Sequence, residues 1–206
     1  MTDIIRPMKY RGSNLGSGTA DNTTFLRGDL TWQVVADAVD LTPLESALVM
    51  MAWDVYTDDR YFDDIATDSF ADTTGIETGS SSGYTSSSGY ISPTANQNMV
   101  LVSQEWEAST NDPLEAFVLF NIEPTNAITL DTDLKAWISI DDGTNYQQIT
   151  GLAIVREIGS YDFVRGELAS VTARGDKTIR LKITGHNNSS NTKQFKLHSW
   201  ACGVRY

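Results

Sequence analysis

The stretch Leu134–Ile149, LKAWISIDDGTNYQQI, decides the fold. From Leu134 to Ile140 every second residue is apolar, which is the pattern of a strand with one buried face. Asp141–Gly143 follows, and it predicts a tight turn because Gly accepts positive φ and an Asp side chain can accept hydrogen bonds from its own backbone. The chain then returns through Tyr146 to Ile149. We therefore predict a β-hairpin.

Outward from this hairpin, residues 98–206 alternate between apolar runs and turn residues. We predict further strands at 99–107, 114–121, 127–130, 152–158, 163–171, 178–184 and 192–204. Their spacing of roughly ten residues is typical of an antiparallel β-sandwich with a jelly-roll-like arrangement. In the last of them the apolar residues change parity between Leu197 and Trp200, which predicts a β-bulge near His198 and Ser199.

The chain upstream of the sandwich lacks this alternation of apolar runs and turns. The fold class we predict is therefore mainly β, with an extended N-terminal segment and one amphipathic helix before the sandwich. We divide the chain into an extended anchoring segment at 1–39, a helix and acidic loop at 40–74, a Gly/Ser-rich connection at 75–97, and the sandwich at 98–206. The capping-box pattern T-P-L-E begins at Thr42. Apolar residues then recur at helical spacing, which predicts an amphipathic helix of about four turns. This helix packs either on its own domain or with two other copies around a threefold axis.

The region from Asp54 to Glu77 contains many carboxylates, opposed only by Arg60. Clustered carboxylates raise the question of a calcium ion, but a calcium loop needs alternating oxygen ligands and a Gly that bends the backbone. No Gly occurs before Gly75. We interpret the region as a helix end and a solvated loop, with calcium as the alternative.

Composition limits the partners. The net charge of −12 argues against general binding of nucleic acid, because phosphate contacts need clustered Lys and Arg. The longest apolar run, Ala47–Trp53, is too short to cross a bilayer, so we expect no membrane insertion. A single cysteine, Cys202, permits no intrachain disulfide, and the N-terminus lacks the apolar core of a signal peptide. Both features fit assembly in a reducing cytoplasm.

Residues that could carry chemistry are few. Ser139–Tyr146 is similar to the Asp-box of sialidases, a structural hairpin that propellers repeat, and here it occurs once. His186 and His198 lack metal-ligand spacing, and Cys202 is typical of a buried small side chain. The chain contains no nucleophile elbow, Walker loop or dinucleotide fingerprint. We therefore expect neither catalysis nor a cofactor nor a metal site.

A resemblance covers much of the chain. Residues 16–32, GSGTADNTTFLRGDLTW, resemble a joint segment of tail fibres and other fibrous virion proteins of tailed bacteriophages, with Leu30 where that segment has Gly. Residues 67–90, TDSFADTTGIETGSSSGYTSSSGY, resemble a second pattern of phage virion proteins. A third patch comprises LKAWISIDDGTNYQQI, RGELASV, IRLKITGHNN and KLHSWACGV. The three patches follow one another along the chain in the same order as in such phage proteins.

The resemblance implies a trimeric fibre-type structural protein of a virion, with the sandwich as a knob for attachment to the host surface. Its partners would be two further copies, and other virion proteins through the N-terminal segment. A head fibre or capsid decoration protein is the alternative within this class. The candidate residues for a trimer interface are Phe25, Leu26, Trp32, Leu44, Leu48, Met51 and Val55.

A second hypothesis, from another class, is a carbohydrate-binding module of a receptor-binding tip. It needs aromatic rings that form a platform for sugars on a sandwich surface. The candidates are Trp106, Trp137 and Tyr146, each of which lies either in the core or on the surface. A third hypothesis, a depolymerase carried by a fibre, lacks the pair of carboxylates that glycosidases position across the bond they cleave.

Overall fold

The computed structural model describes residues 24–26, 32–34, 63–87, 89–110 and 112–206. The chain divides into two compact units, Met1–Leu41 and Thr42–Tyr206. In the first unit, β1 (Thr24–Leu26) pairs antiparallel with β2 (Trp32–Val34). The trimer candidates Phe25, Leu26 and Trp32 lie on these strands. The predicted helix, with the remaining trimer candidates, lies outside the described residues.

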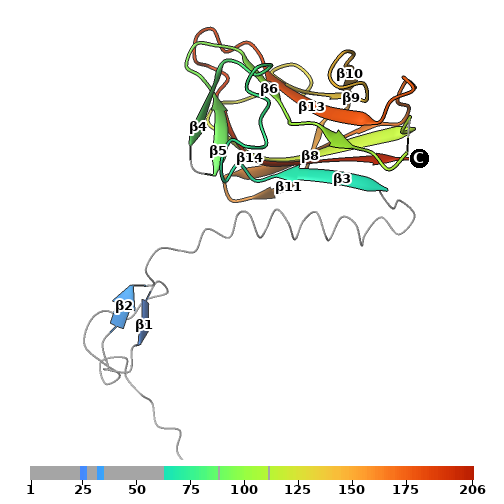
Figure 1. Ribbon diagram of the computed structural model, residues 1–206. Coiled ribbons are helices and arrows are strands. Elements are labelled where there is room, and N and C mark those ends of the chain that lie inside the picture. The colour runs from blue at the N-terminus through green and yellow to red at the C-terminus, as the bar shows by residue number, and fades with distance from the viewer. Residues whose placement is uncertain (1–23, 27–31, 35–62, 88, 111) are drawn as a thin grey trace, which may run out of the picture. The chain divides into compact units, whose positions relative to one another are not determined.

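The second unit contains two antiparallel sheets that face each other, so the predicted β-sandwich is confirmed (Figure 1). The five-stranded sheet has the order β10 (Gln147–Ile149), β9 (Leu134–Ser139), β13 (Thr178–Gly185) and β6 (Met99–Val102), with β7 (Trp106–Glu107) also paired to β13. The seven-stranded sheet has the order β11 (Ala153–Ile158), β12 (Tyr161–Leu168), β8 (Glu115–Pro124), β14 (Phe195–Arg205), β5 (Tyr90–Pro93) and β4 (Tyr84–Ser87), with β3 (Asp64–Asp68) also paired to β14.

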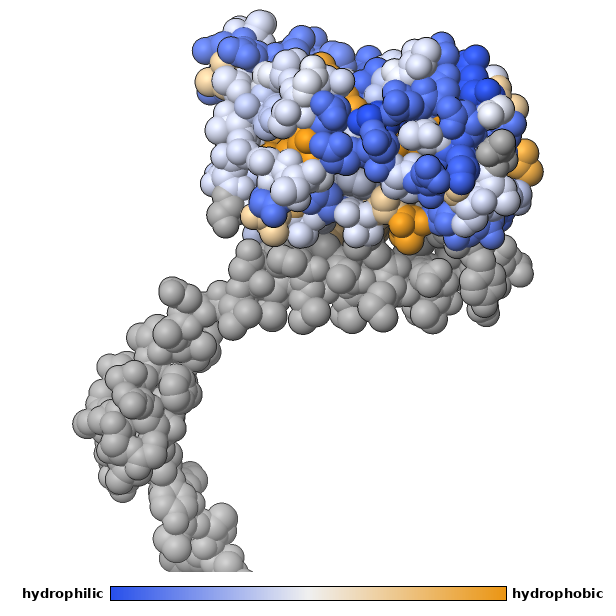
Figure 2. All heavy atoms as spheres, viewed as in Figure 1, coloured by the Kyte–Doolittle hydropathy of each residue, from blue (hydrophilic) through white to orange (hydrophobic). Residues whose placement is uncertain are grey.

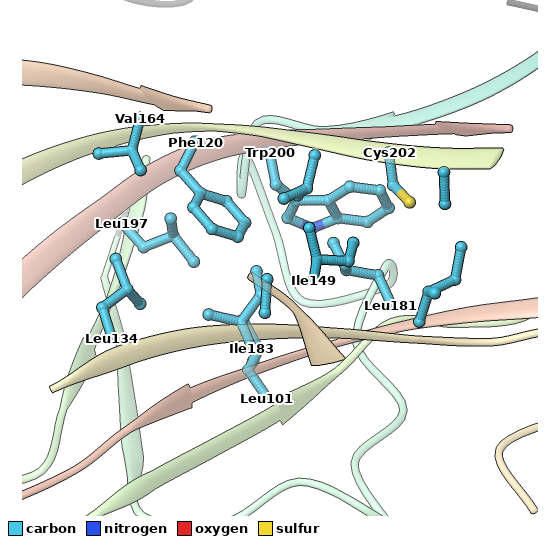
Figure 3. Close-up of a cluster of buried hydrophobic side chains, with 14 of the residues drawn as sticks. Leu101, Phe120, Leu134, Ile149, Val164, Leu181, Ile183, Leu197, Trp200 and Cys202 are labelled. Carbon is cyan, nitrogen blue, oxygen red and sulfur yellow. The ribbon is translucent and has the colours of Figure 1, made fainter. Parts of the chain in front are cut away.

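The core lies between the two sheets and is built from alternate residues of each strand. Figure 3 shows Phe120 and Trp200 of the seven-stranded sheet directed toward Leu134 and Ile183 of the five-stranded sheet. Burial of each such side chain stabilises the fold by roughly 1.5–3 kcal/mol. The period-2 pattern of the sequence therefore corresponds to real burial on the inner faces.

The predicted hairpin forms as expected. The apolar positions of β9 and the following Ile140 are at most 2% exposed. Asp142 and Gly143 have φ of +54° and +81°, so the turn uses the left-handed region that glycine favours. Ser139 Oγ donates to Asp141 Oδ1 at 2.7 Å, and Asn145 N donates to the same carboxylate oxygen at 2.8 Å. The Asp-box resemblance is thus a structural one, because its polar side chains stabilise the turn.

The predicted β-bulge is also confirmed. The register of β14 against β8 shifts between Leu197 and Ser199. Because of this shift, Leu197 and Trp200 both point into the core although their sequence parity differs. On its other edge β14 pairs with β5 at Leu197 and with β3 from Trp200 onward, so two short strands share that edge on the two sides of the bulge.

Three strands of the seven-stranded sheet lie upstream of residue 98. The Gly/Ser-rich connection contains β4 and β5, and the acidic loop contains β3, all three within the seven-stranded sheet. A serine-rich strand is compatible with the edge of this sheet, because β4 pairs with one neighbouring strand and its side chains are mostly exposed. In β3, Asp64 accepts hydrogen bonds from Ser109 and Tyr206, and the Tyr206 bond in particular lowers the pKa of this carboxyl.

The face of the sandwich that Figure 2 shows carries no single large apolar patch. In the view of Figure 2, hydrophilic residues cover most of the described part, with isolated hydrophobic spots between them. Among the described residues, no helix is long and apolar enough to span a bilayer. A binding site on this surface is therefore to be sought in a hollow with polar lining.

Candidate functional site

A hollow of about 250 Å³ lies on the outer face of the five-stranded sheet. We call it the sheet groove. Its floor is formed by β6 and β13, and its walls by the segment 77–82 and the hairpin turn. The lining residues are Glu77, Ser80, Val100, Val102, Asp142, Gly143, Tyr146, Arg180 and Lys182. Drug-sized ligands occupy pockets of roughly 300–1,000 Å³, so this groove suits a smaller unit.

Lys182 lies between two aromatic rings at the sheet groove. Its Nζ is 3.7 Å from the centroid of the Tyr146 ring and 5.0 Å from that of Trp137. The antiparallel register places Trp137 directly opposite Lys182, and the chain returning from the hairpin turn brings the Tyr146 ring to the same ammonium. Burial lowers the pKa of Lys182. In the described part of the chain no carboxylate forms an ion pair with it, so its hydrogen-bond donors remain available to a ligand.

Arg180, two residues earlier on the same face of β13, is fully engaged by the protein. Its Nε donates to Asp142 Oδ1 at 2.6 Å and its Nη1 to the Ser103 carbonyl at 3.2 Å. Its Nη2 forms an ion pair with Glu105. Glu77 Oε2 lies 3.9 Å from Nη1. The guanidinium therefore joins both walls of the groove to its floor, and its role is to hold the groove in shape.

Backbone contacts fix the wall formed by residues 77–82. Glu77 N donates to the Val102 carbonyl at 2.9 Å, and Ser82 exchanges two hydrogen bonds of 2.8 Å with Val100. Ser81 Oγ accepts a hydrogen bond from Val102 N at 2.9 Å. The segment thus covers the edge of β6 and presents the Glu77 carboxylate and Ser80 to the groove.

The opposite wall carries Tyr146. Burial raises the pKa of its hydroxyl, with Arg180 opposing and the Asp142 and Asp141 carboxylates adding to the rise, so the phenol stays protonated and can donate. For Asp141, burial acts to raise the pKa, but hydrogen bonds from Asn145 and Ser139 outweigh it and the pKa is lowered. The turn carboxylate therefore stays ionised and keeps its structural hydrogen bonds.

The structure separates the three predicted aromatic candidates. Trp137 and Tyr146 both lie beside Lys182, and Tyr146 also lines the sheet groove. Trp106 does not join them: it lies opposite Ile179 on the inner face, and its ring packs 6.1 Å from that of Trp200. Its half-buried ring therefore belongs to the core.

Sequence reasoning missed the polar half of the groove. Lys182 and Arg180 occupy the outward positions of β13, and this alternation is visible in the sequence. Their approach to Tyr146 and Glu77 depends on cross-strand register and on a loop that pairs over a distance of more than twenty residues. Nothing in a single sequence determines that register.

The remaining candidate groups have structural partners. The Cys202 thiol is fully buried, and burial raises its pKa, so it is a core residue as expected. His186 Nε2 lies 2.9 Å from Thr184 Oγ1, and His198 Nε2 lies 3.3 Å from Glu123 Oε2. Among the described residues, no three His, Cys, Asp or Glu side chains are arranged to hold a metal ion.

The fold and groove define a β-sandwich protein with a polar and aromatic hollow on one sheet. No family model matches the chain, and no curated protein matches it. Among solved structures, it is similar to a mutant of a carbohydrate-binding module of family 29, with a TM-score of 0.40 and 7% identity over 69% of this chain and 94% of that one. A further family 29 module gives a TM-score of 0.40 and 8% identity over 69% and 90%. Likeness at this level carries no functional argument.

Proposed function

We propose that the sandwich is a non-catalytic binding module whose sheet groove takes one unit of a neutral surface glycan. The observation that carries this proposal is the placement of Lys182 between Trp137 and Tyr146 beside the Glu77 and Asp142 carboxylates. Sugars combine apolar C–H faces, which pack on aromatic rings, with hydroxyls that both donate and accept. Tyr146 and the polar groups line the groove, and the Trp137 ring lies beside Lys182.

The charge of the lining favours a neutral ligand. Two carboxylates, Glu77 and Asp142, oppose two cations, Arg180 and Lys182. A polyanion would gain little from this balanced lining, and Arg180 is already committed to protein carboxylates. A hydroxylated neutral ring can instead donate to the carboxylates and accept from Lys182, and charge-assisted hydrogen bonds of this kind are the stronger ones.

The test is a glycan array of bacterial surface oligosaccharides, followed by calorimetry with the strongest hit. We expect Tyr146→Ala and Lys182→Met each to weaken binding by about tenfold, equivalent to about 1.4 kcal/mol, because each removes a central contact. Tyr161→Ala is the matched control, since Tyr161 is a half-buried aromatic on the other sheet. An array without hits, or equal weakening by the control, would refute glycan binding at this groove.

We further propose that the first unit fastens this module to a virion of a tailed bacteriophage as a homotrimer. Support comes from the joint segment at 16–32 and from the division of the chain, which separates residues 1–41 from the sandwich. Three linked copies would bring weak glycan contacts together at high effective concentration, which raises overall avidity without any new contact.

Light scattering on the purified full chain tests the trimer. We expect a mass about three times the 22.7 kDa of one chain. Trp32→Asp, which places a charge within the joint segment, should reduce the mass to that of one chain, whereas Tyr161→Ala should leave it unchanged. A wild-type chain that elutes as a monomer would rule out the trimer and leave the glycan proposal untouched.

A further inference from the structure

The floor of the sheet groove covers only part of the five-stranded sheet. It is formed by β6 and β13, whereas β9 and β10 continue the same sheet beyond it (Figure 1). One cross-strand row joins the two parts, and its members, in order from β6 to β10, are Val102, Lys182, Trp137 and Gln148. Core residues adjoin each of these positions along the chain, so the row lies on the outer face. Its three intervals between strands give a length of about 14 Å.

The protein holds the Trp137 indole in place through its polar edge. The Nε1 atom donates to Thr184 Oγ1 at 3.2 Å, and His186 Nε2 lies 2.9 Å from the same oxygen. Thr184 is buried, so this hydrogen bond is shielded from water. The indole itself is half-buried. Because its N–H is already used, the ring offers a ligand only carbon surface, and such a surface packs against the C–H face of a sugar.

Gln148 lies beyond Trp137, on the side away from the groove, and its amide is unused. No group in the described part of the chain forms a hydrogen bond with its half-buried side chain. The preceding Gln147 differs, because its Nε2 donates to Thr172 Oγ1 at 2.8 Å and its Oε1 accepts from Thr172 N at 2.7 Å. A free side-chain amide can both donate and accept, as sugar hydroxyls do. Gln148 is therefore a polar group available to a ligand that lies over Trp137.

We propose that Trp137 and Gln148 form a second subsite beside the sheet groove, which takes the next monosaccharide of the same neutral glycan. The inference rests on the proposed function of the groove, and it extends the ligand to an oligosaccharide of at least two sugars. Lys182 lies between the subsites, since its Nζ is 3.7 Å from the Tyr146 ring centroid and 5.0 Å from that of Trp137. Its ammonium has three donors, enough to serve hydroxyls of both sugars. The glycan then runs across the strands, from β6 toward β10.

Calorimetry on the full chain with a length series of the strongest array hit tests the second subsite. We expect the disaccharide to bind the wild type about tenfold more tightly than the monosaccharide. Trp137→Ala should remove this gain and leave the monosaccharide affinity within about twofold of wild type. Lys182→Met should instead weaken the binding of both lengths, because Lys182 contacts both sugars.

Two neighbouring glutamines provide a matched pair of variants. Gln148→Ala should reduce the gain from the second sugar to about threefold, because it removes one polar contact and keeps the indole. Gln147→Ala is the control and should preserve the full gain, since the Gln147 amide is bonded to Thr172. If Trp137→Ala fails to fold, the glutamine pair decides the matter, and an undiminished gain in Gln148→Ala would overturn the proposal.

The length series separates failure of the second subsite from failure of the groove. Equal affinity of the wild type for the monosaccharide and the disaccharide would overturn the second subsite and leave glycan binding in the groove intact. Equal weakening of both lengths by Trp137→Ala would also overturn it, because Trp137 would then contact the sugar in the groove itself. Absence of binding at every length would refute the proposed function, and this inference with it.

Discussion

Gly83→Ala is expected to lower the free energy of unfolding of the sandwich by about 3 kcal/mol. Gly83 has φ of +65°, a conformation that L-residues rarely adopt. A Cβ at this position would lie 2.0 Å from the Asn98 carbonyl oxygen and 3.1 Å from its carbon. Both are backbone atoms, so they cannot rotate aside as a flexible side chain could. The contact also adjoins the hydrogen bond from Thr94 N to the Gly83 carbonyl, which begins the β4–β5 hairpin.

The chain contains a matched control for this prediction. Gly89 has φ of +81°, but a Cβ there would meet nothing within 4 Å. Gly89→Ala therefore carries the backbone strain alone, about 1 kcal/mol. Urea unfolding followed by tryptophan fluorescence measures both variants, and their difference isolates the collision with Asn98. Equal losses would contradict the packing of Gly83 against Asn98, and would support the view that residues 75–97 are only a connection.

Parts of this fold could be predicted because their signals are local. The alternation in Leu134–Ile140 and the Asp141–Gly143 turn follow from residue types within one short stretch. The bulge in β14 could be predicted for the same reason, since a change of parity within one strand requires an extra residue if both halves face one core. None of these inferences needs knowledge of a distant partner.

The strands β3 and β4, upstream of residue 98, had no local signal. β4 is serine-rich and β3 is acidic, and both have the composition of loops because their side chains are mostly polar. Their strand structure comes from pairing with β5 and β14, and the partner of β3 lies far away along the chain. β8 is a different case. The nearly continuous apolar run of β8 from Ala116 to Phe120 is the pattern of a strand buried on both sides, so the residue types themselves indicate a second covering layer.

Arg180→Leu should destabilise the protein by about 2–3 kcal/mol, a loss second to that of Gly83→Ala. The side chain of Arg180 is only 11% exposed, and it donates to Asp142, Glu105 and the Ser103 carbonyl. Leucine preserves much of the apolar contact but leaves carboxylates gathered around an uncharged group. We place the loss below that of a fully buried pair because Asp142 and Glu105 are each 56% exposed and keep part of their hydration.

Lys177→Leu is the control for Arg180→Leu. Lys177 pairs with Glu107 at 3.0 Å beside the same strand, but its side chain is 41% exposed and that of Glu107 is 68% exposed. An exposed pair contributes about 0–1 kcal/mol, so unfolding of this variant should be close to wild type. If Arg180→Leu were equally mild, Arg180 would not hold the walls of the sheet groove together, and its guanidinium would be available to a ligand. The two cations of β13 therefore have different roles, and Arg180 maintains the groove. Lys182→Met should weaken glycan binding with little effect on the free energy of unfolding, because Lys182 has no carboxylate partner among the described residues.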